Sequence, residues 1–250
     1  MLNKDNTLDI FYKNREDIEW TNTWIENCRD KDVEHWLLIG DSVARSFRSD
    51  LSNLLDKPVD FIGTSSSFED PCFYNIFQAF FNKNIYKYTK IIVMLGCKHG
   101  CYYKISEDSK NVLKYRELYY NFIKYLKQYS KDIIILSSTP DKQKNNLKKW
   151  NDSSNQEIEA RNNIQKEIAI NNNIKFIDIY QLVKFNNYPY IDFCHLADKS
   201  CTNQVALYIN DEINCIKKDI TFYKHKTTHR VFNILGIKIK IKRKQRWTKT

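Results

Sequence analysis

Short apolar runs alternate with longer amphipathic segments along most of the 250-residue chain. The apolar runs have the length of buried strands and lie at 36–39, 58–62, 91–95, 132–137 and 174–179. The segments that follow them repeat apolar residues every three or four positions, as helices do, and lie at 43–55, 73–81, 107–130, 156–170 and 202–216. This alternation predicts an α/β fold with a three-layer, doubly wound parallel sheet.

The two ends of the chain differ from this alternating part. Residues 8–29 are amphipathic and predict an N-terminal helix, whereas the residues after 220 are basic. We therefore expect an N-terminal helical extension (1–30), one α/β domain (31–219) and a basic tail (220–250). A hydrophobic content of 42%, with only 5 Gly and 4 Pro, is typical of a globular chain and excludes a linker-rich one.

The first predicted strand passes directly into a helix at a serine. The run Trp36-Leu37-Leu38-Ile39 ends at Gly40, and Asp41 and Ser42 follow before the helical pattern begins. In a parallel sheet this junction lies at the carboxyl edge, where ligands bind. Free N–H groups at the helix N-terminus would suit an oxyanion. Without further evidence, Asp41 and Ser42 could equally be an ordinary helix N-cap with no catalytic role.

A second polar motif stands about 150 residues later, before the last predicted helix. Asp192 and His195 are spaced D-x-x-H in a short loop. A serine nucleophile needs a general base to take its proton and a carboxylate to orient that base. Because both predicted positions lie at the same edge of the sheet, Ser42, His195 and Asp192 together predict a catalytic triad.

The two motifs resemble those of the SGNH/GDSL hydrolase superfamily. The GDS at 40–42 and the D-x-x-H at 192–195 match its first and last blocks, and Arg45 makes the first block most similar to that of polysaccharide O-acetyl esterases and acetyltransferases. The resemblance spans roughly residues 33–216. It implies a flavodoxin-like sheet, an acyl-enzyme formed on Ser42, no metal and no cofactor, and acetyl-CoA as a possible acyl donor for a transferase.

The resemblance also assigns further site residues. It implies an oxyanion hole made by the N–H groups of Ser42 and Gly63, and substrate contacts at Asp41 and Arg45. The superfamily has an asparagine as a third oxyanion donor, but Lys98 stands at that place here and His99 follows. We expect Lys98 or His99 to replace the amide. The alternative is a catalytically decayed module that binds a glycan or a membrane.

Seven cysteines suggest the cellular setting and one alternative site. The number is odd and the first residues have no apolar core of a signal peptide, so we expect free thiols in the cytoplasm. Zinc bound by two groups of residues is a less favoured interpretation, as is a disulfide between Cys101 and Cys201. The residues of the zinc alternative are Cys97, His99, Cys101, Cys194, His195 and Cys201.

The net charge of +10 comes entirely from the tail. Ten of the 40 basic residues and none of the 30 acidic ones lie from 220 to 250. Three interpretations of the tail stay open. We favour binding to an anionic membrane or glycolipid surface. The tail could instead form an edge strand, because IKIKIK alternates with period two, or bind nucleic acid, which the neutral charge of the rest of the chain disfavours. The predicted membrane-binding residues are Lys238, Lys240, Lys242, Arg243, Lys244 and Arg246.

These patterns combine into one functional hypothesis. The sequence predicts a serine-dependent O-acyl ester hydrolase or transferase whose acyl group is acetyl. Its expected substrate is a cell-surface polysaccharide or a glycolipid precursor, met at the inner face of a membrane. We expect no nucleic-acid partner.

Overall fold

The computed structural model describes residues 19–30, 32–83, 87–142 and 155–214, together with the backbone of 229–234 and 237–242. The chain divides into two compact units, Met1–Asn214 and Cys215–Thr250, which we describe separately.

A six-stranded sheet forms the centre of the first unit. Its strand order is β1-β3-β2-β4-β5-β6; all neighbours are parallel except β1 and β3. Because the order runs outward from β2 in both directions, the sheet is doubly wound, as the alternating pattern predicted. The strands are β1 (Thr21–Trp24), β2 (Trp36–Gly40), β3 (Val59–Thr64), β4 (Lys90–Met94), β5 (Ile133–Leu136) and β6 (Lys175–Ile177).

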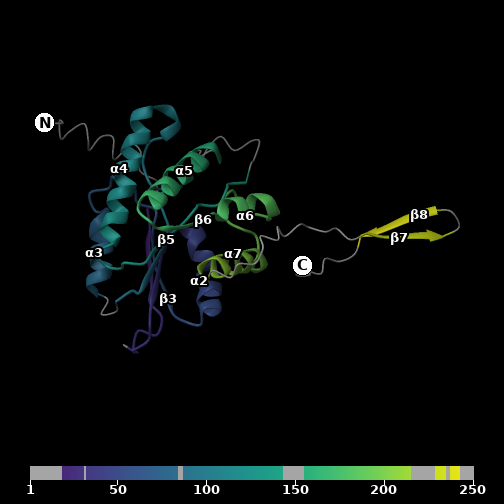
Figure 1. The fold of residues 1–250 in the computed structure, drawn as a ribbon, viewed down its shortest axis with the longest axis horizontal. Coiled ribbons are helices and arrows are strands. Elements are labelled where there is room, and N and C mark those ends of the chain that lie inside the picture. Colours follow the sequence, from purple (N-terminus) through teal and green to yellow (C-terminus); the bar gives the residue numbers. More distant parts are fainter. Residues whose placement is uncertain are drawn as a thin grey trace. The chain divides into compact units, whose positions relative to one another are not determined.

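Helices cover both faces of this sheet, so that the unit has three layers (Figure 1). Alternate strand residues point to opposite faces. Leu37 and Ile39 belong to the core beneath α3, α4 and α5, whereas Trp36 and Leu38 belong to the core beneath α2, α6 and α7. The helices are α2 (Ser42–Leu55), α3 (Phe73–Lys83), α4 (Ser109–Leu126), α5 (Asn155–Asn171), α6 (Ile179–Asn186) and α7 (Lys199–Ile213), with a 3₁₀ turn η1 (Ile105–Glu107) before α4.

The N-terminal helix predicted over 8–29 is wrong in its described part. Residues Thr21–Trp24 form β1, which pairs antiparallel with the outer edge of β3. Two β-branched threonines favour the extended backbone here, and the open edge of β3 offers hydrogen-bond partners along its whole length. The amphipathic spacing could not reveal this edge, because the edge belongs to a strand some 40 positions away. Residues 1–18 lie outside the described residues.

The second unit contains a β-hairpin made of β7 (His229–Ile234) and β8 (Ile237–Lys242). The IKIKIK segment therefore has the extended backbone of the strand interpretation, paired with β7 in a two-stranded sheet, and the membrane interpretation stays a prediction. The predicted membrane-binding residues Arg243, Lys244 and Arg246 lie outside the described residues.

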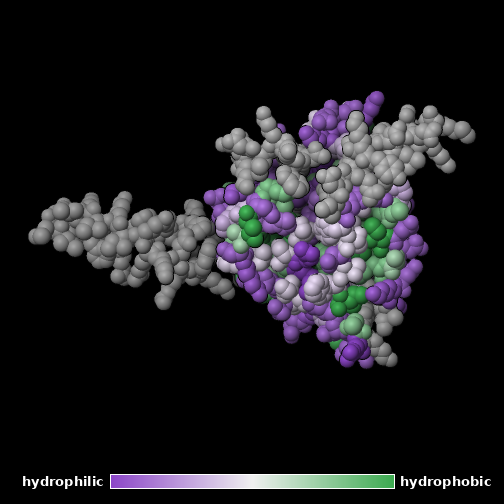
Figure 2. Space-filling model, turned by 180° about the vertical axis from the view of Figure 1, so that it is seen from behind, coloured by the Kyte–Doolittle hydropathy of each residue, from purple (hydrophilic) through white to green (hydrophobic). Residues whose placement is uncertain are grey.

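None of the described helices is both long enough and apolar enough to cross a lipid bilayer. On the face drawn in Figure 2, apolar residues form separate patches among hydrophilic ones rather than one continuous area.

Candidate active site

The junction between β2 and α2 holds Ser42 at the carboxyl edge of the sheet. A Cβ atom on Gly40 would lie 2.2 Å from Cβ of Ala44 and 3.0 Å from the backbone oxygen of Met94, so only glycine fits where the strand meets the first helical turn. Asp41 then caps the helix, because its Oδ1 accepts hydrogen bonds from the N–H groups of Val43 and Ala44 at 2.9 and 3.2 Å. Ser42 is therefore the first residue of α2.

The loop that carries His195 is ordered by its own carboxylate. Oδ1 of Asp192 accepts hydrogen bonds from the N–H groups of Cys194 and His195, each at 2.8 Å. The N–H of Ile191 in turn donates to the backbone oxygen of His195 at 2.9 Å. These bonds close a tight turn, so Asp192 positions the histidine through the backbone as well as through the ring.

A chain of two short hydrogen bonds joins the three predicted triad residues. Nε2 of His195 lies 2.7 Å from Oγ of Ser42, and Nδ1 of His195 lies 2.7 Å from Oδ2 of Asp192. The carboxylate can only accept, so Nδ1 carries a proton and Nε2 is left to accept the proton of the serine hydroxyl. This is the arrangement that a general base requires.

Electrostatics keep the Asp192 carboxylate ionised. Partial burial acts to raise its pKa, but hydrogen bonds from the N–H groups of His195 and Cys194, together with the His195 ring, lower the pKa of Asp192 to about 2. The neighbouring thiol behaves oppositely, since burial raises the pKa of Cys194 to about 12. Its Sγ lies 3.4 Å from Nδ1 of His195. At neutral pH Asp192 is thus the anion that faces the imidazole, and Cys194 is a neutral neighbour.

Comparisons with known proteins bear on the fold that carries these residues. No protein-family model matches the sequence, and no curated protein sequence is significantly similar to it. An inferred acylhydrolase from Bacteroides fragilis NCTC 9343 is 15% identical, with a TM-score of 0.53 over 75% of this chain and 89% of its own. An inferred SGNH hydrolase from Slackia heliotrinireducens is 10% identical, with a TM-score of 0.52 over 73% of this chain and 100% of its own. The chain has the SGNH hydrolase fold.

An acetyl xylan esterase, AlAXEase, is also similar in structure. It is 13% identical, with a TM-score of 0.51 over 74% of this chain and 100% of its own. At such low identities the similarity establishes the fold. The resemblance drawn from the GDS and D-x-x-H motifs is confirmed at that level.

The first predicted oxyanion donor is the N–H of Ser42, and its role stays a prediction. The N–H of Ser42, as the first of the helix, has no intrahelical acceptor and lies at the positive end of the helix dipole.

The second predicted donor, the N–H of Gly63, is not available. Gly63 lies inside β3, between Gly40 of β2 and Asn22 of β1. The N–H of Ser65 donates to Trp20 on the β1 side at 3.1 Å, and N–H directions alternate along a strand, so the N–H of Gly63 also points at β1. The prediction placed Gly63 just after the strand, whereas pairing with β1 extends the strand to Thr64.

Lys98 does not serve as a free replacement for the missing amide. Its Nζ lies 2.6 Å from Oδ1 of Asp141, and the two side chains are only 5% and 13% exposed. A buried ammonium that already faces a carboxylate makes a poor donor to a second anion. His99, half-buried in the same loop, remains the predicted donor of the two.

The two predicted substrate contacts have different outcomes. Asp41 is 3% exposed and its carboxylate caps α2, which gives it a structural role in place of the predicted one. Arg45 is exposed one turn after the nucleophile, and no ion pair in the described residues involves it. A contact between Arg45 and substrate stays a prediction.

The cysteines and histidines do not assemble as the zinc alternative required. Among the described residues, the side chains whose ligand atoms lie within 4.8 Å of one another are Asp192, Cys194 and His195, and His195 is already engaged by Ser42. Cys101 and Cys201, which the disulfide alternative joined, are both free.

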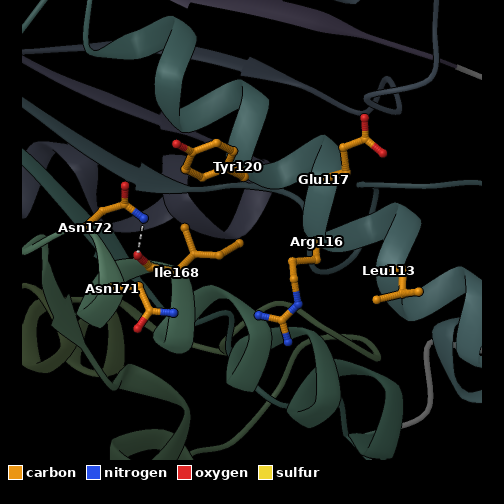
Figure 3. Close-up of a pocket in the computed structure, with 7 residues that line it drawn as sticks. All are labelled: Leu113, Arg116, Glu117, Tyr120, Ile168, Asn171 and Asn172. Atoms are coloured by element: carbon orange, nitrogen blue, oxygen red, sulfur yellow. Dashed lines mark hydrogen bonds between the residues drawn. The ribbon is translucent and has the colours of Figure 1, made fainter.

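Two hollows on the surface are candidates for a ligand. One, of about 380 Å³, lies between α4 and α5 and is shown in Figure 3. It is lined by apolar and polar side chains, among them Leu113, Ile168, Arg116 and Glu117. The other, of about 340 Å³, is lined in part by Ser46 and Asp50 of α2 and by Ile191 and Leu196 of the loop that carries His195. The sequence analysis missed the residues of this second hollow.

Proposed function

We propose that this protein is a serine-dependent carboxylester hydrolase or acyltransferase. His195 takes the proton of the Ser42 hydroxyl at Nε2, and the serine oxygen attacks the ester carbonyl. The N–H of Ser42 stabilises the oxyanion, and Asp192 stabilises the imidazolium that forms. His195 then returns the proton to the departing alcohol, which leaves an acyl-enzyme on Ser42.

The observation that carries this proposal is the unbroken chain from Ser42 Oγ through His195 to Asp192, with both contacts at 2.7 Å. A decayed binding module has no need to keep a base within hydrogen-bond reach of a serine hydroxyl. The geometry therefore favours an enzyme over the alternative of a glycan- or membrane-binding module.

We further propose that the acyl group is acetyl and that its carrier is a cell-surface polysaccharide or a glycolipid precursor. The first block of the sequence supports this choice, and so does the structural similarity to a protein named as an acetyl xylan esterase. If water accepts the acetyl group from Ser42, the protein is an esterase. If a sugar hydroxyl accepts it, the protein is a transferase, and acetyl-CoA is a candidate acetyl donor.

The tail supports a place at an anionic membrane surface. In the hairpin, β7 and β8 pair so that Phe232 is opposite Ile239 and Val231 is opposite Lys240. In an antiparallel pair, opposed positions share a face of the ribbon, and successive pairs alternate between the two faces. The apolar positions Phe232, Ile239 and Ile241 therefore share one face. The three lysine positions of β8 share the other face. Such a ribbon suits an interface that is apolar within and anionic at its surface.

The proposed chemistry is tested by labelling with a fluorophosphonate, followed by peptide mass mapping and by turnover of p-nitrophenyl acetate. We expect Ser42 to be labelled, and we expect labelling and turnover to disappear in both Ser42→Ala and His195→Ala. Circular dichroism must show that the variants are folded. A folded wild-type protein that is not labelled at Ser42 would overturn the proposal.

A further inference from the structure

The loop that follows β4, residues 95–106, begins beside the nucleophile. Gly40 and Met94 are paired across β2 and β4, so the turn that carries Ser42 and the first residues of this loop leave the sheet at the same edge. The loop carries His99, which with the N–H of Ser42 makes up the predicted oxyanion donors that remain. The path of the loop backbone therefore decides how a donor at His99 approaches an oxyanion formed at Ser42.

One face of α5 turns a buried ion pair towards this loop. Glu157 is 0% exposed and Arg161 is 3% exposed. The two residues are one helical turn apart, and Nη2 of Arg161 lies 2.9 Å from Oε1 of Glu157. Replacing such a pair by apolar residues of similar volume is often neutral for stability, because desolvation offsets much of the attraction. The contacts of the pair, rather than its own attraction, therefore indicate its role.

The ion pair holds the loop at four backbone atoms. Arg161 donates from Nη1 to the backbone oxygen of Cys97 at 3.0 Å and from Nη2 to that of Tyr103 at 2.9 Å. Glu157 accepts hydrogen bonds from the N–H groups of the first two residues of η1, at 2.6 and 3.1 Å. Because these partners are backbone atoms, the pair fixes the path of the loop itself. His99 lies between the two positions that Arg161 holds.

Two further buried residues of α5 extend these contacts to the start of the loop. Nε2 of Gln165 donates to the backbone oxygen of Leu95, the first residue of the loop, at 3.1 Å. Oδ1 of Asn162 accepts from the thiol of Cys97 at 3.0 Å and from the N–H of Ser138, which follows β5, at 2.8 Å. The loop is thus held by α5 from its first residue to η1.

We propose that Glu157 and Arg161 are positioning residues of the active site, which act through the loop 95–106 and set the place of His99 relative to Ser42. The inference rests on the proposed ester chemistry. It adds a helix on which the sequence analysis placed no functional residue. Because the oxyanion forms only during the reaction, a misplaced donor lowers kcat and leaves KM nearly unchanged.

The test replaces Arg161 by lysine in the full chain. Lysine keeps the charge that faces Glu157, but its single ammonium lacks the planar fork that reaches Cys97 and Tyr103 together. Rates are measured with p-nitrophenyl acetate and expressed per active site, counted by complete fluorophosphonate labelling of Ser42. We expect Arg161→Lys to lower kcat about tenfold or more, since loss of a whole oxyanion donor costs about 10²–10³-fold. KM should stay within about twofold.

An exposed arginine that pairs with the same helix provides the matched control. Arg116 of α4, drawn in Figure 3, contacts Glu167 of α5 through Nη2 at 2.6 Å, and both side chains are exposed. Arg116→Lys makes the same chemical change away from the loop, so kcat and KM should both stay at their wild-type values.

Two further readouts separate positioning from stability. In Arg161→Lys the backbone amides of 95–106 should exchange hydrogen faster than in the wild type, whereas those of 190–197, which carry the base, should not. The pH dependence of kcat/KM, which reports that base, should stay the same.

The outcomes distinguish the inference from the chemistry on which it rests. An unchanged kcat per labelled site, or a lower kcat with unchanged exchange of 95–106, would overturn the positioning role and leave the proposed function in place. If Arg161→Lys does not fold, Glu157→Gln is measured instead with the same expectations, since glutamine keeps one oxygen for the N–H groups of η1 and removes the charge. A folded wild-type protein that is not labelled at Ser42 would overturn the proposed function, and this inference with it.

Discussion

The sharpest perturbation of the site is Asp192→Asn, because it changes one hydrogen-bond direction and little else. Asparagine retains an oxygen that can accept from the N–H groups of Cys194 and His195, so the loop should keep its turn. At the place of Oδ2, however, an amide NH₂ would face Nδ1 of His195. Nδ1 must then act as the acceptor, and the ring proton moves to Nε2. The Ser42 hydroxyl consequently loses the base that should take its proton.

The size of the effect follows from this reversal. The same change in an established Ser-His-Asp enzyme lowers kcat about 10⁴-fold through the wrong tautomer. At 1.36 kcal/mol for each tenfold change, this is about 5.5 kcal/mol of activation free energy. Stability should change little, because Asp192 is partly exposed and an exposed ion pair contributes about 1 kcal/mol or less.

The assay is the steady-state hydrolysis of p-nitrophenyl acetate at pH 7.5, with thermal unfolding measured in parallel. Asp198→Asn is the matched control, because it removes the same charge three residues after His195. Asp198 caps α7 through Oδ1, and asparagine caps a helix as well as aspartate does. We expect the control to retain its activity. If Asp192→Asn kept more than a tenth of the wild-type kcat in a folded protein, Asp192 would not orient the base, and the triad assignment would be refuted.

Three further predictions follow from the same contacts. Gly40→Ala should cost about 1–3 kcal/mol of unfolding free energy and lower kcat, because the new methyl group meets Ala44. Denaturant unfolding measures the free energy and aryl acetate hydrolysis measures kcat. Unchanged values would contradict the close approach of Gly40 to Ala44. Lys98→Met should cost about 1–3 kcal/mol, because it removes the ammonium that faces the buried carboxylate of Asp141. Adding Asp141→Leu should recover part of this loss in thermal melts, and no recovery would contradict the pairing. The pKa of Asp192 is lowered in the folded state, so its contribution to stability is present above about pH 4 and is lost as the pH falls towards 2. The stability difference between wild type and Asp192→Asn should therefore shrink over that range, and a constant difference would contradict the lowered pKa.

The parts of the site that the sequence predicted correctly are those set by local pattern. The strand, the glycine turn and the helix around Ser42 lie within one continuous stretch, and their order is fixed by apolar periodicity and by the capping chemistry of Asp41. The D-x-x-H loop is equally local, since Asp192 reaches the backbone of a residue three positions away. The meeting of Ser42 with His195 follows from the parallel sheet, which brings both to one edge.

The errors arose where the outcome depends on distant partners. Gly63 was expected just after the strand, but β1 pairs alongside it and extends the strand to Thr64. The hollow was missed because Ser42, Ser46 and Ser49 recur at i, i+4 and i+7, a stripe that is typical of a solvent-facing helix surface. Only the packing of α7 against α2 brings Thr202 and Lys199 to Asp50 and turns that polar stripe into the wall of a hollow.

The ion pair between Lys98 and Asp141 shows how a departure from a family motif can still act on the site. A buried ion pair is weak support for stability by itself, because desolvation offsets much of the attraction. Here its position matters more than its energy. The segment that holds Asp141 also accepts a hydrogen bond from the Tyr190 hydroxyl at Pro140, at 2.7 Å, and donates one from Lys142 to the backbone oxygen of Phe193, at 2.6 Å.

Both Tyr190 and Phe193 belong to the loop that carries His195. Lys98 thus ties the end of β4 to the segment on which that loop rests, so its removal should displace the imidazole without changing any group that contacts substrate. Lys98, which stands where an oxyanion donor was expected, would then act by positioning His195. Of the predicted oxyanion donors, the N–H of Ser42 and His99 then remain. Loss of one such donor typically costs 10²–10³-fold in kcat, so this site should favour esters with good leaving groups, which depend least on a complete oxyanion hole.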